Sequence, residues 1–362
     1  MRCRVALIVA LASSACGWKT RSQHQRDYVN EELMPHVAAD SAEAPLRPVR
    51  SKLRLEILAD ARYRALPEWH NEIATQVQQA SDLLFRQVGV ELDVARIGDW
   101  DRPKGSDDIE RALRELEAEV PARDVDLVIG LITPLPLVTS AIHSLGVTRL
   151  MGRHIVLRGM DDVSEMMALR EHFDALGDTE RFEIYRARKR HKQGIVLAHE
   201  VAHTMGLIHV KDGDLVMSTS WSPEQTGFAP EEVKIFHLGL AFHVRRLREA
   251  QAHGPIEDEW RAARTERLRT SAWPAWDPGE REQLLAGEPV APMKPAPSPV
   301  SAPPSRSAPA SGSVVPPPPL PMPLRRPPAP PRSSAIPLRW TPATSTRCSA
   351  PPWARRWKRS ER

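Results

Sequence analysis

The sequence HEVAHTMGLIH, residues 199–209, spaces three histidines and a glycine in a pattern typical of a metal-binding active site. Residues four apart lie on one face of a helix, so His199 and His203 can hold the same ion. Gly206 can take the left-handed conformation that ends the helix and lets His209 return to that ion. Three neutral imidazoles leave one position of zinc open, as in catalytic sites. The sequence therefore predicts a Zn²⁺ ion bound by these histidines.

Glu200 directly follows the first histidine. A zinc ion lowers the pKa of water and polarises a carbonyl group, and a nearby carboxylate can take the proton from that water and pass it to the leaving group. We therefore predict hydrolysis by a zinc-activated water with Glu200 as general base. The alternative is an amphipathic helix that carries two histidines by chance, but Gly206 and His209 stand in phase with them and disfavour it.

Met217 stands eight residues after His209. With this methionine the pattern resembles the metzincin clan of zinc endopeptidases, in which a Met-turn follows the third histidine and lies beneath the metal. The stretch 212–217 is most similar to that of the matrixins, although Val210 replaces their serine. Thr219 replaces the tyrosine of astacins and serralysins. The resemblance implies an enzyme that hydrolyses peptide bonds. It also implies an α+β fold with a mixed twisted sheet, an active-site helix, a Met-turn and a C-terminal helix.

Hydrophobic periodicity predicts the elements around the motif. It predicts strands over 53–60, 90–97, 125–133, 145–150 and 154–158, and helices over 67–87, 107–120 and 230–249. The run 125–133 should be the central buried strand. By the resemblance, 145–150 is the edge strand along which a protein or peptide substrate binds extended, unless it faces only solvent.

The active helix is expected to begin near His191 or Gln193, after a charged, mostly helical insertion over 161–192. Trp221 and Pro223 could form the wall of the pocket for the residue after the scissile bond, or Trp221 could belong to the core. The other histidines are predicted to be structural or on the surface rather than ligands, namely His143, His154, His172, His191, His237 and His243. Additional structural Zn²⁺ or Ca²⁺ is left open.

The N-terminus has the features of a secretory signal, residues 1–16. Two arginines precede an apolar run over 5–12, which is far shorter than the ~20 residues of a membrane-spanning helix. Cys16 stands where a bacterial lipoprotein carries its lipid, although Ser13 replaces the usual leucine. We therefore predict an extracytoplasmic protein that is either anchored through lipid on Cys16 or cleaved and secreted.

The chain has only three cysteines, and none lies between Gly17 and His199. A disulfide framework is therefore excluded for the catalytic region. The cysteine-based latency of the vertebrate matrixins is absent, and the cysteine-built second zinc site of the archaemetzincins cannot form.

Composition changes sharply after Glu288, where 22 of the 35 prolines lie. Such a segment cannot bury enough apolar surface to fold, so 288–362 is predicted to be a disordered, basic tail. The residues after Glu288 carry a net charge of +11, whereas the whole chain carries +4, so the chain up to Glu288 carries −7 and offers no basic groove for nucleic acid. Translation of GC-rich DNA out of frame would give a similar composition, and this alternative stays open.

The predicted order is a signal peptide over 1–16, a flexible tether over 17–50, a metzincin-like catalytic domain over 51–250, a helical extension over 251–287 and the tail. The protein is expected to be a monomer. Two other functions remain: a catalytically silent, surface-anchored binding or scaffold protein with this fold, and an adhesion module whose useful part is the proline-rich tail.

Overall fold

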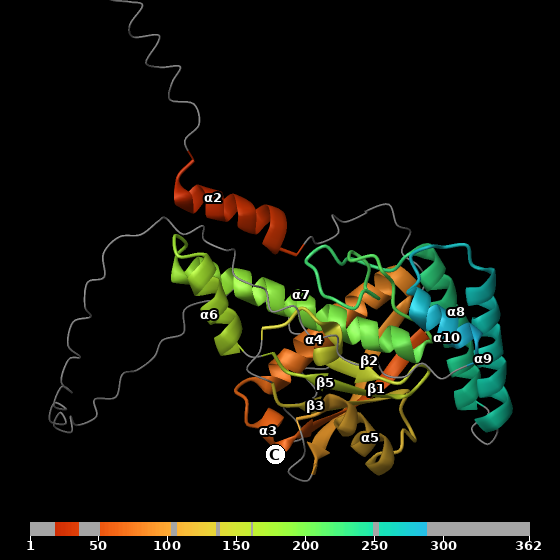
Figure 1. Ribbon diagram of the computed structural model, residues 1–362. Coiled ribbons are helices and arrows are strands. Elements are labelled where there is room, and N and C mark those ends of the chain that lie inside the picture. The colour runs from red at the N-terminus through yellow and green to blue at the C-terminus, as the bar shows by residue number, and fades with distance from the viewer. Residues whose placement is uncertain are drawn as a thin grey trace, which may run out of the picture. The chain divides into compact units, whose positions relative to one another are not determined.

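Figure 1 shows the computed structural model, which describes residues 19–35, 51–102, 107–134, 138–160, 162–248 and 253–287. All of them belong to one compact unit, 1–298, and the second unit, 299–362, lies wholly outside the described residues. The predicted signal peptide with Cys16 and the predicted tail also lie outside them.

A mixed sheet of five strands in the order β2-β1-β3-β5-β4 forms the centre of the described chain. Its strands are β1 (Ser51–Asp60), β2 (Val90–Trp100), β3 (Leu127–Ile132), β4 (Gly146–Thr148) and β5 (His154–Arg158). All neighbours pair in parallel except β4, which pairs antiparallel with β5. The central place of β3 and the edge place of β4 are as predicted, and the α+β class is confirmed.

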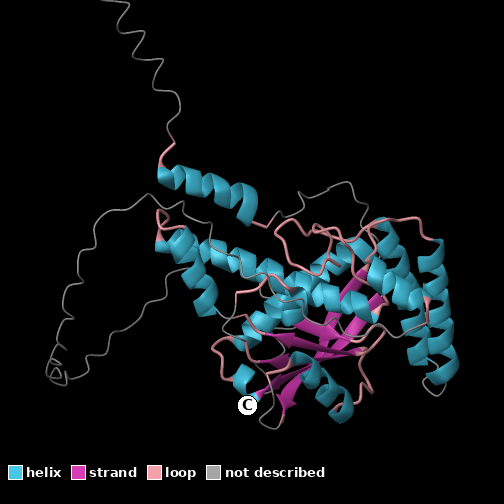
Figure 2. Ribbon diagram, viewed as in Figure 1, coloured by secondary structure: helices cyan, strands magenta, loops and turns pink. Residues whose placement is uncertain are grey.

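Two hydrophobic cores lie on opposite faces of the sheet, because successive side chains of a strand point to opposite sides. The larger core takes alternate residues of β3 from Leu127 to Leu131 and lies beneath α4 (Trp69–Val88) and α7 (Asp178–Thr204). The smaller core takes Val128 and lies beneath α5 (Ile109–Glu119). Figure 2 shows the strands between these helices, and α7 is the helix that carries the first two histidines of the motif.

Three helices follow the motif: α8 (Pro230–Arg248), α9 (His253–Thr270) and α10 (Pro278–Leu285). They lie together beside one end of α7 (Figure 1). Trp260 of α9 is fully buried and Trp276 is 2% exposed, so aromatic side chains dock this segment onto the rest of the unit.

Gly239 of α8 lies against the turn that ends the active helix. A Cβ atom built at this glycine would stand 2.0 Å from the Met205 carbonyl oxygen, so alanine fits only if the backbone moves. We expect Gly239→Ala to lower the free energy of unfolding by about 1–3 kcal/mol, because overpacking outweighs the gain in helix propensity. Urea denaturation measures this. Gly213→Ala is the control, because an added Cβ there meets nothing within 4 Å, and equal stability of the two variants would contradict the expectation.

The start of the active helix differs from the prediction. Helix α7 begins at Asp178, well before His191, and follows α6 (Asp162–His172). The cause is that charged residues supply part of its buried face. Lys189 is 8% exposed and pairs with Glu72 at 2.6 Å and with Asp162 at 2.7 Å, so hydrophobic periodicity could not reveal this part of the helix.

The predicted tether contains ordered structure in its described part. Helix α2 (Arg21–Tyr28) is capped by Thr20 and continues into a short π-helix, η2 (Val29–Leu33). Arg26 pairs with Glu180 at the start of α7 at 2.6 Å, and Val29 is buried in a small core that also contains Phe173. This contact could not be predicted from the sequence, because a single buried valine produces no periodic hydrophobic pattern.

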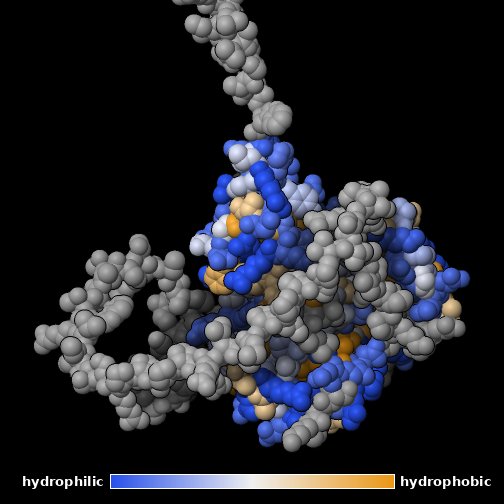
Figure 3. Space-filling view, turned by 60° about the vertical axis from the view of Figure 1, so that its left-hand side comes forward, coloured by the Kyte–Doolittle hydropathy of each residue, from blue (hydrophilic) through white to orange (hydrophobic). Residues whose placement is uncertain are grey.

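The described surface visible in Figure 3 is mostly hydrophilic, with hydrophobic side chains in small patches. No helix in the described ranges has both the length and the apolar character needed to cross a membrane.

Candidate metal centre and catalytic site

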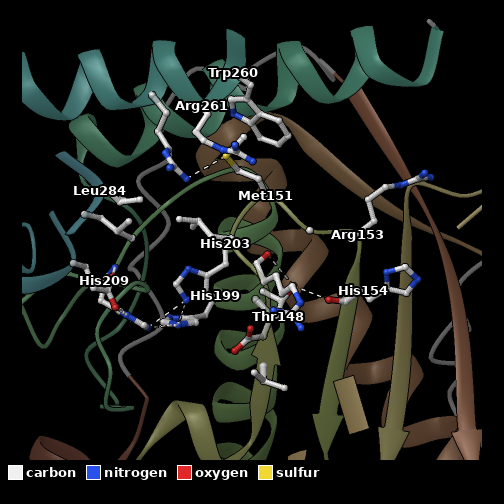
Figure 4. A pocket seen from close by; sticks show the side chains of 18 of the residues that line it. Thr148, Met151, Arg153, His154, His199, His203, His209, Trp260, Arg261 and Leu284 are labelled. Atoms are coloured by element: carbon white, nitrogen blue, oxygen red, sulfur yellow. Dashed lines mark hydrogen bonds and ion pairs between the residues drawn. The ribbon is translucent and has the colours of Figure 1, made fainter. Parts of the chain in front are cut away.

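Three imidazole rings of the motif converge on one point. Helix α7 carries His199 and His203, the chain turns at Gly206 with φ of +90°, and His209 returns to them. The Nε2 atoms of His199 and His203 lie 2.9 Å apart, and each lies 3.2 Å from Nε2 of His209 (Figure 4). This arrangement is the one predicted from the spacing, and these nitrogens can hold one metal ion.

The outer nitrogen of each ring is bonded to an acceptor. Nδ1–H of His199 donates to the Val216 carbonyl at 2.8 Å, and Nδ1–H of His203 donates to the Leu207 carbonyl at 2.8 Å. Such bonds fix the tautomer, so the Nε2 lone pairs face the shared point. Burial and neighbouring rings lower the pKa of His199 well below its ordinary value and that of His203 to about 4. Neutral, oriented imidazoles are the donor set that zinc requires, so these residues fit the metal.

The third ring is held by a carboxylate from the C-terminal extension. Glu280 of α10 accepts a hydrogen bond from Nδ1–H of His209 at 2.5 Å through Oε1 and one from the His209 backbone N–H at 2.9 Å through Oε2. Burial by itself raises the pKa of Glu280, but these bonds from His209 hold it below its ordinary value. Glu280 therefore orients the third histidine as a carboxylate.

Sequence reasoning missed Glu280. Asp277 caps α10 and accepts a hydrogen bond from the backbone N–H of Glu280, and Pro278 follows it, so the start of a helix was visible in the sequence. The contact of Glu280 with His209 could not be predicted, because it depends on a β-bridge between Val210 and Trp276. This bridge brings the segment after the motif alongside the segment before α10.

Glu200 lies inside the site without a bonding partner for one of its oxygens. The residue is 2% exposed, and its Oε2 atom has no hydrogen bond within the described structure. Its carboxylate lies beside the edge strand, since a Cβ built on Gly146 would stand 2.7 Å from Oε1. Burial raises the pKa of Glu200 well above its ordinary value. A neighbouring dication would favour the carboxylate, so this group can exchange a proton at the site.

Met217 is fully buried, and it directly follows Val216, whose carbonyl accepts the hydrogen bond from the His199 ring. The Met217 carbonyl accepts a hydrogen bond from the N–H of Val210 at 3.1 Å. This segment therefore holds the His199 ring and the backbone that follows His209. Trp221 is 8% exposed and belongs to the larger core rather than to the residues that line the cleft, so the core alternative holds for it.

The site opens into a cleft of about 1810 Å³. It lies between the segment around β4 and the helices α9 and α10, and its lining includes Glu200, Glu280 and the three histidines. His143 also lines it, and Nδ1 of that ring is buried and has no hydrogen-bond partner in the part of the chain that the structure describes.

Within the described residues the other histidines predicted to be structural do not join the three converging rings, although His143 and His154 line the same cleft. His154 bonds to the Val120 carbonyl, His172 to the Ala168 carbonyl, and His191 to the Gln225 carbonyl. His243 bonds to Asp126 at 3.0 Å, and His237 to the Val88 carbonyl. These bonds agree with the structural roles predicted for them.

Several solved structures are similar to the described fold. Archaemetzincin from Methanopyrus kandleri shares 20% identity over 54% of this chain and 99% of its own, with a TM-score of 0.35. Metalloproteinase-II from Bacteroides fragilis shares 16% identity over 55% of this chain and 59% of its own, with a TM-score of 0.31. A zinc-dependent peptidase from Methanocorpusculum labreanum shares 14% identity over 50% and 99%, with a TM-score of 0.28. No curated protein matches the sequence.

A family model gives the assignment. The model Reprolysin_5, described as metallo-peptidase family M12, matches residues 49–232, just over half of the chain. The matched range includes the motif and the Met217 turn but ends before Glu280. This match does not show the more specific similarity to the matrixins that the sequence predicted. The chain belongs to metallopeptidase family M12, and it is a metzincin-like, zinc-dependent peptidase whose cofactor is Zn²⁺.

Proposed function

We propose that this peptidase is an endopeptidase in which His199, His203 and His209 hold the zinc ion and Glu200 is the general base. The observation that carries the proposal is the Glu200 carboxylate, which is buried, lacks a partner at Oε2 and is next in sequence to a converging histidine. No other acid needs to be invoked for proton transfer.

Bound zinc would supply a Lewis acid that lowers the pKa of water and polarises the scissile carbonyl. Glu200 accepts the proton of the attacking water at its carboxylate and then donates it to the leaving amine. Glu280 keeps the His209 ring in place throughout, and the buried Met217 turn supports the floor of the site.

Substrate binding is proposed to use the free edge of β4. This strand pairs with β5 on one side only, and it reaches the Glu200 carboxylate at Gly146. An extended peptide can add to such an edge by main-chain hydrogen bonds, which are independent of sequence. This mode places the scissile bond in the middle of a chain, as an endopeptidase requires. A monomer suffices for it.

We also infer an extracytoplasmic location, in which the protein is either anchored through lipid on Cys16 or cleaved and secreted. The support is the basic and apolar pattern of residues 1–16, which lie outside the described structure. The likeness to matrixins stays a prediction that depends on the spacing from His209 to Met217. The alternative, a silent scaffold with this fold, is disfavoured because Glu200 and all three histidines are present together.

A peptide blocked at both ends tests the proposal. An acetylated and amidated peptide library should be cut at internal bonds by the zinc-loaded protein, and a chelator should abolish cutting until zinc is restored, because the three histidines lose their ion. Mass spectrometry of the products measures both effects. Cutting that requires a free terminus would exclude an endopeptidase, and no cutting of any peptide would favour the silent scaffold.

A further inference from the structure

Arg264 of α9 is a buried arginine that lines the cleft. Its side chain is 3% exposed, yet its only hydrogen bond within the described residues runs from Nη1 to the sulfur of Met151 at 3.1 Å. A thioether is a weak acceptor, and guanidinium carries five N–H donors. Most of the hydrogen-bonding capacity of Arg264 is therefore unused.

The nearby acids are paired with other arginines. Three acidic residues of α9 line the cleft, and each pairs with an arginine other than Arg264. Glu257 pairs with Arg246 at 3.6 Å, Asp258 pairs with Arg261 at 3.4 Å, and Glu266 pairs with Arg269. Within the described ranges no carboxylate forms an ion pair with Arg264. A buried charge without a counterion is costly, so its presence calls for a partner.

The other unpaired groups around Arg264 are donors too. Nε of Arg264, Nε of Arg246 and Nε1 of Trp260 are all buried and have no hydrogen-bond partner among the described residues, and all three residues line the same cleft. Burial and the charge of Arg261 lower the pKa of Arg264 to about 10, so the group stays protonated at neutral pH. A cluster made of donors and positive charge fits an anion and does not fit a cation.

This cluster adjoins the metal centre. The Cδ atom of Arg264 would lie 3.2 Å from a Cβ built on Gly206, the residue that turns the chain between the second and third histidines. Met151, which contacts the guanidinium, donates its backbone N–H to the His203 carbonyl at 2.9 Å. In the view of Figure 4, Met151 lies between Trp260 and His203. An anion bound here would belong to a molecule that also reaches the catalytic site.

We propose that Arg264, with the N–H donors of Trp260 and Arg246, forms a subsite that binds a carboxylate of the peptide substrate. The inference rests on the proposed peptidase function. The carboxylate can come from an Asp or Glu side chain or from the C-terminus of the peptide, because both present the same two oxygens. Guanidinium binds such a group through two parallel hydrogen bonds, which gives specificity as well as affinity.

Matched peptides test the subsite on the full-length, zinc-loaded protein. One series places Glu or Gln at each position around the cleavage site, and a second series ends in a free carboxylate or an amide. We expect kcat/KM to be about 10–100-fold higher for one Glu peptide than for its Gln partner, or for the acid terminus than for the amide, as suits a charge-assisted hydrogen bond in a buried site. The series that shows the difference identifies the source of the carboxylate.

Arg264→Met keeps most of the volume and removes the charge, so it should abolish this preference between the matched peptides. Arg267→Met is the control, because Arg267 lies on the same helix, is outside the cleft lining and pairs with Glu231 at 3.4 Å. Thermal melting shows whether each variant is folded. If Arg264→Met does not fold, the peptide comparison on the unmodified protein still decides the question.

Two outcomes separate this inference from the function on which it rests. Equal cleavage of all matched peptides by the unmodified protein would overturn the subsite and leave the peptidase intact. If no peptide is cleaved, the dissociation constants of the matched peptides are measured by calorimetry on the zinc-loaded protein. A preference for the carboxylate peptide in binding then supports the subsite without turnover, and equal binding overturns it.

Discussion

Replacing Glu200 by glutamine should leave zinc bound and lower kcat for peptide cleavage by about 10²–10⁴-fold. Glutamine has nearly the same shape as glutamate but cannot accept a proton, and the three histidines are untouched. Steady-state kinetics on a blocked peptide gives the rate, and elemental analysis gives the zinc content.

Glu183→Gln is the matched control, because Glu183 lies on the same helix, α7, and is exposed to solvent. It should keep both zinc and activity. Retained activity in Glu200→Gln would remove Glu200 from the mechanism. Loss of zinc together with activity would instead assign Glu200 a role in building the site.

Glu280→Gln is expected to weaken zinc binding by about 10–100-fold, because the residue that orients a ligand contributes to the affinity of the metal. Glutamine keeps one oxygen that can accept from the His209 ring. Its amide nitrogen then faces the backbone N–H of His209, which loses the acceptor it has in Oε2 of Glu280. Competition with a chromogenic chelator measures the affinity.

The control is Glu282→Gln, which changes an exposed residue on the same short helix, α10. It should bind zinc as the unchanged protein does. At saturating zinc, Glu280→Gln should recover much of its activity, since it acts through His209 rather than on the substrate. Unchanged zinc affinity in Glu280→Gln would show that the His209 ring needs no support from the extension.

The parts of the site that sequence could predict are local. His199 and His203 share a helix face, and Gly206 permits the turn to His209, so their convergence follows from backbone geometry. The central strand was predictable for a similar reason, because a strand buried on both faces is apolar throughout, as β3 is from Leu127 to Ile132.

The parts that sequence could not predict depend on contacts between distant residues or on buried charge. The part of α7 that precedes the motif carries Lys189 and Lys192, whose burial is compensated by Glu72, Asp162 and Glu165. An apolar pattern cannot reveal such a face. Arg264 was equally hidden, since an arginine on a charged helix gives no sign of being buried. The contact between Glu280 and His209 joins two segments that no local rule connects.

The bond between Glu280 and His209 also sets the order in which the site can be completed during synthesis. The two residues are 71 positions apart, so the third histidine has no carboxylate partner until the ribosome has released residue 280. The helix with the first two histidines and its sheet precede that point, and domains fold as units while the chain emerges. A nascent or prematurely ended chain that contains the whole motif would therefore hold zinc less firmly than the finished protein, so full activity would appear only late in synthesis.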